Sequence, residues 1–451
     1  MKVAFHTLGC KVNQYETEAL KEQFIERGFI VVPEDTFSDV YVINTCSVTN
    51  LADRKSRQYI RRMKKVNPES VIAVTGCYAQ LKPEEVGEIE GVNIICGTNE
   101  KHHLPKYVME CMEQKQRHAS FYRRPYEDLT EYVETGIVRS MESRTRAYIK
   151  VQEGCDRFCA YCVIPYARGA VRSRDPASVM EEAAALVEAG FKEIILTGIN
   201  TALYGMEKGF TEHHASALKD LEIGEEEKGI SILLSLLDRM EGDFRVRLSS
   251  LEPTVINSDY VKQLFSYRRL CHHLHLSLQS GSNDILKAMN RRYDLAEYKR
   301  ILEVLRRFDR NYGITTDIIV GFPGETEAQF KETFDFIQSE AFCKVHVFKY
   351  SKRDETKASA MSDQISGPVK NHRSRVLSEI AEESALRFYQ NNIGNNRVVL
   401  FEEYNEKSRI NTGYTDNYIR AYVESDINLE NTFCTVRLVA PFLDGMRGEC
   451  L

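Results

Sequence analysis

The sequence predicts an α/β protein in three parts: an N-terminal parallel α/β domain, a central partial or complete (β/α) barrel, and a small antiparallel β-barrel at the C-terminus. Two stretches in which short apolar strands alternate with helical patterns predict the first two parts. A charged, polar connection from about residue 114 to residue 145 separates them, and short strands with period-2 alternation predict the third. We place the domains at residues 1–114, 141–371 and 374–441.

Composition limits the class of protein. Of the 451 residues 43% are hydrophobic and 28% are charged, so the chain can form apolar cores and is not disordered throughout. No apolar run reaches the roughly 18 residues of a membrane span, and the first residues lack the apolar segment of a signal peptide. We therefore expect a cytoplasmic protein with no membrane partner. The net charge of −6 gives no overall basic field, so any nucleic-acid surface must be local.

Three predicted strands of the N-terminal part each lead into a cysteine. VAFHTLGC ends at Cys10, VYVINTC at Cys46 and VIAVTGC at Cys77. Because the carboxyl ends of parallel strands meet at one edge of a sheet, three cysteines that are far apart in the sequence can converge there. A fourth strand places Cys96 similarly. Cys96 could be an additional or exchanging metal ligand, but we expect a buried structural thiol there, since free cysteine is among the most buried residue types.

The central part begins with the densest group of cysteines in the chain. Cys155, Cys159 and Cys162 lie in CDRFCAYC, directly after the strand-like YIKVQ and its short continuation. Three thiolates on one short loop can bind three irons of a [4Fe–4S] cluster and leave the fourth iron open. Zinc would need a fourth Cys or His nearby, and the local sequence offers none. The spacing therefore predicts an iron–sulfur cluster with one open iron.

A later strand carries three histidines, His272, His273 and His275. We expect them to line the core or a cofactor pocket rather than to bind a metal. Because side chains alternate along a strand, we expect His273 on the opposite face from the other two.

The central motifs resemble the radical S-adenosylmethionine (SAM) superfamily. CDRFCAYC matches its cysteine motif, and LTGIN, LQSGS and IVGFPGE fall where the superfamily contacts SAM. The resemblance implies a radical SAM core whose open iron chelates SAM, and whose electron splits a C–S bond to give a 5′-deoxyadenosyl radical. It also implies a set of cofactor-binding residues: Tyr161, Thr197, Gly198, Asn200, Ser249, Gln279 and Gly321.

With three cysteines upstream and a β-barrel downstream, nearly the whole chain resembles the methylthiotransferase family. This resemblance implies that Cys10, Cys46 and Cys77 hold a second [4Fe–4S] cluster, whose open iron carries the sulfur to be methylated and delivered. Asn13, in CKVN, matches an element that accompanies the first ligand. The family's final barrel is a TRAM domain, an RNA-binding module. One SAM would donate the methyl group and a second would form the radical.

Clusters of Lys and Arg indicate where the chain could bind RNA. The stretch 53–65, directly after Cys46, holds seven Lys/Arg and one Asp, which is typical of an RNA-binding face but also of a merely solvated helix. We take these residues and two arginines near the central cysteines as RNA-binding candidates: Arg54, Lys55, Arg57, Arg61, Arg62, Arg168 and Arg172. Residues 374–451 hold eight Lys/Arg against twelve Asp/Glu, so the last barrel needs a selective basic face to bind RNA.

Three branches of the family differ in substrate: isopentenyl-adenosine in tRNA, threonylcarbamoyl-adenosine in tRNA, and an aspartate of a ribosomal protein. NTCSVT and EGCDRFCAYCVIPYARG resemble the threonylcarbamoyl-adenosine branch most, which predicts methylthiolation at C2 of that base beside the anticodon. Its carboxylate would favour a cationic pocket, to which Arg168 or Arg172 could contribute. The implied partners are tRNA, a flavodoxin- or ferredoxin-like reductant protein and a sulfur source. A different sulfur-inserting radical SAM enzyme, and an electron carrier or RNA-binding protein without catalysis, stay as alternatives.

Overall fold

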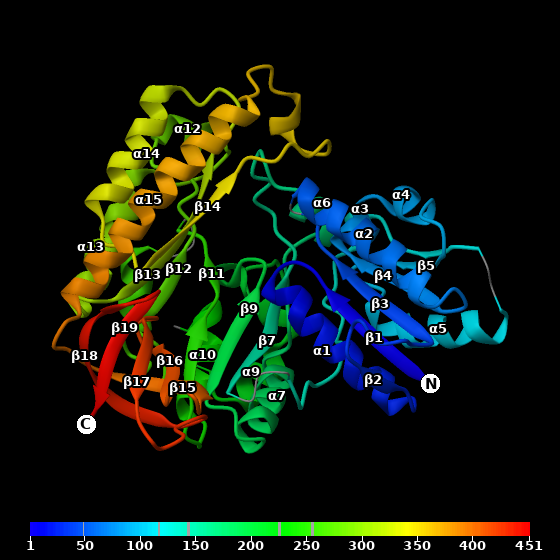
Figure 1. The fold of residues 1–451 in the computed structure, drawn as a ribbon, viewed down its shortest axis with the longest axis horizontal. Helices are drawn as coiled ribbons and strands as arrows, with labels where there is room; N and C mark the ends of the chain where they lie inside the picture. The colour runs from blue at the N-terminus through cyan, green and yellow to red at the C-terminus, as the bar shows by residue number, and fades with distance from the viewer. Residues whose placement is uncertain (48, 116–117, 142–144, 224–226, 254–256) are drawn as a thin grey trace.

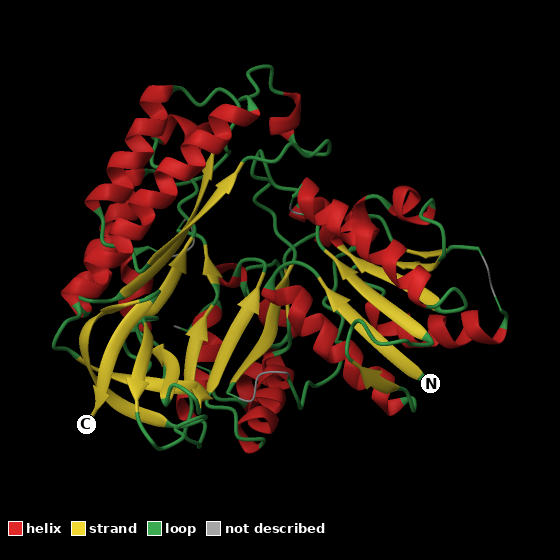
Figure 2. Cartoon of the chain, in the orientation of Figure 1, coloured by secondary structure: helices red, strands yellow, loops and turns green. Residues whose placement is uncertain are grey.

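The computed structural model describes the chain except for residues 48, 116–117, 142–144, 224–226 and 254–256. Three parts follow one another: a sheet at the N-terminus, a central set of parallel strands, and a small barrel at the C-terminus (Figure 1). Helices cover both faces of the first sheet and the outer side of the central strands (Figure 2). No helix in the described part of the chain is both long and apolar enough to cross a membrane.

The N-terminal sheet has six parallel strands in the order β2-β1-β3-β4-β5-β6. Its strands are β1 Lys2–Thr7, β2 Ile30–Val32, β3 Val40–Thr45, β4 Val71–Gly76, β5 Val92–Cys96 and β6 Ser120–Tyr122. Its helices are α1 Lys11–Glu26, α2 Asn50–Val66, α3 Cys77–Leu81, α4 Pro83–Gly87 and α5 Leu104–Glu113. β3 and β4 are buried along their whole length, as expected for parallel strands covered on both faces. The sheet takes in β6, which lies beyond the boundary placed at residue 114.

The central strands form a partial barrel. β10 pairs with β9, and β11, one residue further on, pairs with β12 in a second sheet, so this stretch joins the two halves. In the described residues no pairing connects β7 to β14, so the barrel is open. The strands are β7 Arg146–Glu153, β8 Arg172–Ser173, β9 Glu193–Gly198, β10 Arg245–Leu248, β11 Ser250–Leu251, β12 His273–Leu276, β13 Gly313–Val320 and β14 Lys344–Lys349. All named pairings are parallel except that of β8 with β7.

Helices pack outside these strands around one large apolar core. They are α7 Pro176–Glu188, α8 Phe210–His213, α9 Ala215–Asp220, α10 Ile230–Arg239, α11 Ser258–Leu264, α12 Asn283–Ala288, α13 Leu295–Phe308, α14 Glu327–Ser339 and α15 Gly367–Asn391, while the short α6 Ile164–Arg168 contacts α3 of the N-terminal domain. Capping boxes at Asp294 and Thr326 fix where α13 and α14 begin. α15 packs on β14 and runs through the boundary placed at 371–374.

The C-terminal part is a closed five-stranded barrel in the order β15-β16-β17-β19-β18. Its strands are β15 Asn396–Asn405, β16 Ile410–Thr415, β17 Arg420–Glu424, β18 Phe433–Phe442 and β19 Gly445–Cys450. Its pairings are antiparallel except that of β17 with β19, and β19 lies beyond residue 441. Asn417 donates to the Asn311 carbonyl at 2.9 Å, which ties the barrel to the end of the central sheet.

Candidate functional site

The central cysteines lie on the loop that follows β7. The N–H of Cys155 donates to the Gly169 carbonyl at 3.1 Å, and that of Cys162 to the Cys159 carbonyl at 2.9 Å. Gly154, just before the loop, has a φ of +72°, and a Cβ there would lie 1.7 Å from the Ala170 carbonyl oxygen. Only glycine therefore allows the chain to turn from β7 into this loop without displacement.

A buried ionic group lies beside this loop. Arg291 donates from Nη1 to the sulfur of Cys159 at 3.3 Å, and its charge is balanced by Glu252, 3.3 Å away. Glu252 also pairs with Arg157 at 2.9 Å. Burial raises the pKa of Cys155 to about 12, so this thiol is protonated until a metal ion replaces the proton. Cationic N–H donors beside buried thiols suit an anionic iron–sulfur group.

The N-terminal cysteines follow three neighbouring strands of the sheet, as the strand pattern predicts. Cys10, Cys46 and Cys77 follow β1, β3 and β4, which are neighbours in the sheet. A Cβ on Gly9, the residue before Cys10, would lie 3.1 Å from the sulfur of Cys46, so the backbone after β1 passes close to that thiol. The amide of Asn13 donates to the carbonyls of Leu8 and Thr45, at 2.7 and 3.0 Å, and so joins the ends of β1 and β3.

In the described part of the chain, neither triad forms a site for a single metal ion, because no group of three His, Cys, Asp or Glu side chains there is arranged to hold one. A [4Fe–4S] cluster makes a different demand, because each thiolate binds its own iron. Burial raises the pKa of Cys77, and the nearby Arg168 guanidinium opposes that rise.

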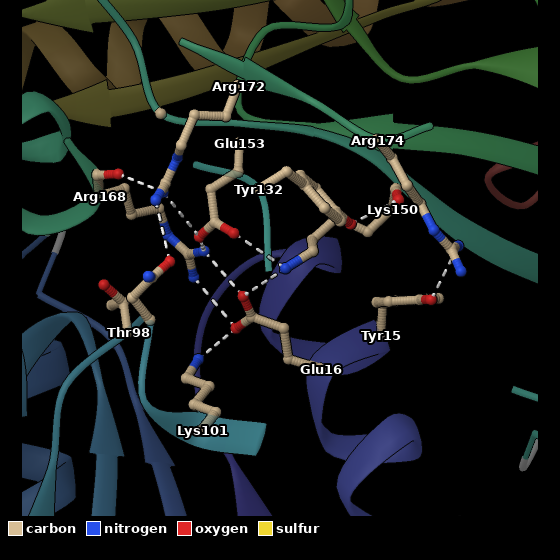
Figure 3. A network of polar contacts seen from close by, with 12 residues as sticks. Tyr15, Glu16, Thr98, Lys101, Tyr132, Lys150, Glu153, Arg168, Arg172 and Arg174 are labelled. Atoms are coloured by element: carbon tan, nitrogen blue, oxygen red, sulfur yellow. Dashed lines mark hydrogen bonds and ion pairs between the residues drawn. The ribbon is translucent and has the colours of Figure 1, made fainter. Parts of the chain in front are cut away.

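A buried network of charges joins residues of the N-terminal and central domains (Figure 3). Glu16, on α1, accepts from Arg168 at 2.9 Å and Lys150 at 3.2 Å, and also pairs with Lys101. Glu153, at the end of β7, accepts from Arg168 at 2.5 Å and Lys150 at 2.9 Å. The cations hold the pKa of Glu153 at about 2 against the effect of burial. The network joins the N-terminal domain to the central one.

This network corrects two of the RNA-binding candidates. Arg168 is fully buried and Arg172 is 2% exposed. Arg172 donates to the Asn99 side chain at 2.9 Å and to the Arg168 carbonyl at 2.6 Å. Neither guanidinium can reach a phosphate or a substrate carboxylate, because both are buried and hydrogen-bonded to groups inside the protein. The interpretation from proximity to the cysteines was wrong.

The basic helix α2 keeps its exposed cations. Arg54, Lys55 and Arg61 are exposed. Two others have partners within the domain, since Arg57 donates to the Tyr78 hydroxyl at 2.9 Å and Arg62 pairs with Asp35.

Two adjacent pockets adjoin the cysteines, the smaller at the central triad and the larger at Cys10. A pocket of about 230 Å³ is lined by Tyr161, Cys162 and Gln279, among others. A larger one of about 540 Å³ reaches from Cys10 across the open ends of the central strands to Tyr418 of the last barrel. Both are lined by Asp317 and Phe348, so they are neighbours. Phe348 is 48% exposed, which leaves an aromatic face open beside both pockets.

The predicted cofactor-binding residues divide between these places. Thr197, Gly198 and Ser249 line the larger pocket, and Tyr161 and Gln279 line the smaller one.

Asn200 and Gly321 line neither of these two pockets. Asn200 donates to Glu252 at 3.1 Å, and the Gly321 N–H donates to Glu325 at 2.7 Å.

Two further side chains of the larger pocket correct the faces expected for the histidines. His273 and His275 share a face of β12 and both contact the Thr315 hydroxyl at 3.0 Å. Residues two apart in a strand lie on the same face, so His272 is the one that points elsewhere, toward Asp309 at 2.8 Å. Both His273 and His275 line the pocket, as expected, and the expected face of His273 was wrong.

Sequence reasoning missed Lys11, Glu252 and Arg291. No spacing pattern marks the ionic partners of a thiol, because they come from other strands. The position of Lys11 could have indicated a role near the N-terminal triad, because it directly follows Cys10 and begins α1. Burial, and next the nearby Arg146, lower the pKa of Lys11 to about 8. Cys96, by contrast, is fully buried at the end of β5, as expected.

Comparison with known proteins identifies the family. The Radical SAM superfamily matches residues 149–337, and Uncharacterized protein family UPF0004 matches residues 2–97. Threonylcarbamoyladenosine tRNA methylthiotransferase MtaB of Bacillus subtilis (strain 168) is 41% identical over 97% of this chain and 93% of that protein. The chain belongs to the radical SAM methylthiotransferase family. MtaB of Thermotoga maritima is 37% identical over 93% of this chain and 90% of its own.

Membership makes this protein an enzyme that uses a [4Fe–4S] cluster and SAM. A second group of relatives carries another name: tRNA-2-methylthio-N(6)-dimethylallyladenosine synthase of Carboxydothermus hydrogenoformans is 33% identical over 88% of this chain and 87% of its own. The fold is similar to a solved radical SAM methyltransferase, TsrM from Kitasatospora setae, with a TM-score of 0.53 and 13% identity over 77% of this chain and 72% of that one.

Proposed function

We propose that this enzyme converts N6-threonylcarbamoyladenosine beside the anticodon of tRNA to its 2-methylthio derivative. The observation that carries this is the 41% identity, over nearly the full length of both chains, to a protein named for that reaction. The relatives named for dimethylallyladenosine are less similar, at 33% or below. Methylthiolation of that base is the second candidate.

Two cysteine triads fit the two parts of such a reaction. We propose that Cys155, Cys159 and Cys162 hold the cluster that binds SAM, and that Cys10, Cys46 and Cys77 hold a second [4Fe–4S] cluster that carries sulfur. When bound, these groups supply a radical able to remove an unactivated aromatic hydrogen and the sulfur that replaces it. The smaller pocket touches the first triad and the larger pocket touches the second, and the two pockets are adjacent.

The chain's own residues position these parts. Arg291 donates to Cys159 and is held by Glu252, which fixes a positive charge beside the SAM-binding triad. The network around Glu16 and Arg168 joins the two domains, and thereby sets the separation of the triads. The substrate base lies in a single-stranded loop, where it can enter a pocket without the opening of a duplex.

The remaining contacts are with macromolecules. We propose that Arg54, Lys55 and Arg61, on the exposed face of α2, bind RNA phosphates, and that the C-terminal barrel contributes a further RNA contact. A flavodoxin- or ferredoxin-like protein would supply electrons. The source of the sulfur is a separate partner.

Nucleoside mass spectrometry of total tRNA, from cells with and without the gene, tests the function. We expect loss of the methylthio-threonylcarbamoyl nucleoside and accumulation of its unthiolated precursor. Loss of methylthio-isopentenyladenosine instead would assign the protein to the second candidate. Unchanged tRNA, with a missing methylthio group on a ribosomal-protein aspartate, would contradict both.

A further inference from the structure

The larger pocket contains a lysine, Lys11, that makes no ion pair with any described residue. Lys11 lines it, with Nζ 5.8 Å from the centre of the Tyr148 ring. Glu193, a carboxylate close enough to act on this ammonium group, is itself bound by Arg245 and Arg247. Burying an ammonium group without a counter-charge costs free energy. We therefore expect an anionic ligand to bind beside Lys11.

Arg247 and Asp317, the other charged side chains of the pocket, each have a hydrogen-bond partner. Arg247 makes two hydrogen bonds of 3.0 Å to Glu193, which is fully buried. Asp317 contacts His275 at 3.2 Å. Of the described residues that line this pocket, Lys11 is therefore the cation available to a ligand.

Two further atoms indicate a polar ligand. In the described part of the chain, His273 Nδ1 and Ser249 Oγ are buried and have no hydrogen-bond partner. Both side chains are more than nine-tenths buried, at 3% and 6% exposed, and both line the same pocket. Buried polar atoms are rarely left without partners, so a ligand with donors or acceptors is expected beside them.

We propose that Lys11 binds the carboxylate of the threonylcarbamoyl arm and so selects this nucleoside over unmodified adenosine. This inference rests on the proposed function. On adenine, the N6 arm and C2 flank N1 on the same edge of the base. A base whose C2 faces the sulfur carried near Cys10 therefore extends its N6 arm along the same side, and Lys11 directly follows Cys10. Arg168 and Arg172, the sequence-based candidates for this role, are occupied by the buried network.

The test compares reconstituted enzymes on two RNAs. One is an anticodon stem-loop that carries N6-threonylcarbamoyladenosine, and the other is the same RNA with the threonyl carboxylate converted to its amide. The wild type should bind the acid about tenfold to a hundredfold more tightly than the amide, as expected for one charge-assisted hydrogen bond. Lys11→Met should lose this preference and Lys11→Arg should keep most of it. Lys21→Met, further along the same helix, serves as the matched control and should keep it fully.

Three measurements separate the possible outcomes. If the wild type does not prefer the acid, the inference fails even when Lys11→Met cannot be prepared with its full iron content. If wild type and Lys11→Met prefer the acid RNA over the amide RNA to the same extent, the inference about Lys11 also fails. In that case, methylthiolation of the acid RNA by the wild type would still support the proposed function. SAM has a carboxylate too: a tenfold loss of SAM affinity in Lys11→Met, with RNA preference unchanged, would assign Lys11 to SAM. Failure of the wild type to modify the acid RNA would overturn the proposed function and the inference together.

Discussion

The two cysteine triads have the same composition, but one lies on a single loop and the other comes from the ends of three strands. Cys155, Cys159 and Cys162 lie within eight residues on one loop, which its own backbone hydrogen bonds and one glycine shape. The N-terminal triad is assembled from three strand ends, and exists only when β1, β3 and β4 lie side by side in register. The first triad therefore depends on local sequence and the second on the whole sheet.

Removal of each triad should give the largest and most distinct effects. Changing Cys155, Cys159 and Cys162 to Ala should halve the iron content, from about eight per chain, and abolish SAM cleavage. The corresponding change of the N-terminal triad should also halve the iron but leave some uncoupled formation of 5′-deoxyadenosine. Iron analysis after anaerobic reconstitution measures the iron content, and chromatography of 5′-deoxyadenosine measures SAM cleavage. A full iron content in the N-terminal variant would contradict the two-cluster proposal.

Two glycines give a finer test of the same comparison. Gly76 ends β4 with a φ of +95°, and a Cβ there would lie 2.2 Å from the Thr45 carbonyl oxygen. Gly76→Ala should therefore separate β3 from β4, lower the iron of the N-terminal triad and spare SAM cleavage. Gly154→Ala is the matched variant and should do the reverse, since it distorts the loop after β7. If the two variants lose iron and SAM cleavage to the same extent, the two triads do not fold independently.

The buried network should affect stability rather than RNA binding. Arg168→Met leaves Glu16 and Glu153 buried with less positive charge, at a cost of about 3–5 kcal/mol. Denaturant unfolding of the cluster-free protein measures this change. Arg307→Gln, on the exposed face of α13, is the control and should change stability by less than about 0.5 kcal/mol. A similar small change in Arg168→Met would show that the network contributes little to joining the domains.

The smallest effect is expected on the surface of α2. Charge reversal at Arg54 and Arg61 should weaken RNA binding and lower the slope of log affinity against log salt by about one unit for each phosphate that is no longer neutralised. Iron content and SAM cleavage should not change. Arg300→Glu, on α13 at the opposite side of the molecule from α2 (Figure 1), is the matched control. An unaltered slope would make α2 a solvated face only.

The arginines show where the sequence was misleading. Arg168 and Arg172 and the arginines of α2 all lie close in sequence to cluster cysteines, so charge and proximity could not separate them. In the fold, Arg168 is buried among carboxylates from two domains while Arg61 is exposed. Glu16 and Glu153, the partners of Arg168, are 137 residues apart, at positions 16 and 153, and no local pattern links them. Exposure is a property of packing.

The sequence by itself determined the elements and the cysteine chemistry. Strand and helix periodicity predicted the three parts, and the C-x3-C-x2-C spacing predicted the central cluster site, because both depend on residues that are close along the chain. Tertiary structure alone decided that the central barrel is open, which arginines are buried, and that Lys11 enters the same pocket as His273 and Ser249. These depend on contacts between strands far apart in sequence, where packing and charge pairing select one arrangement among many that the local pattern allows.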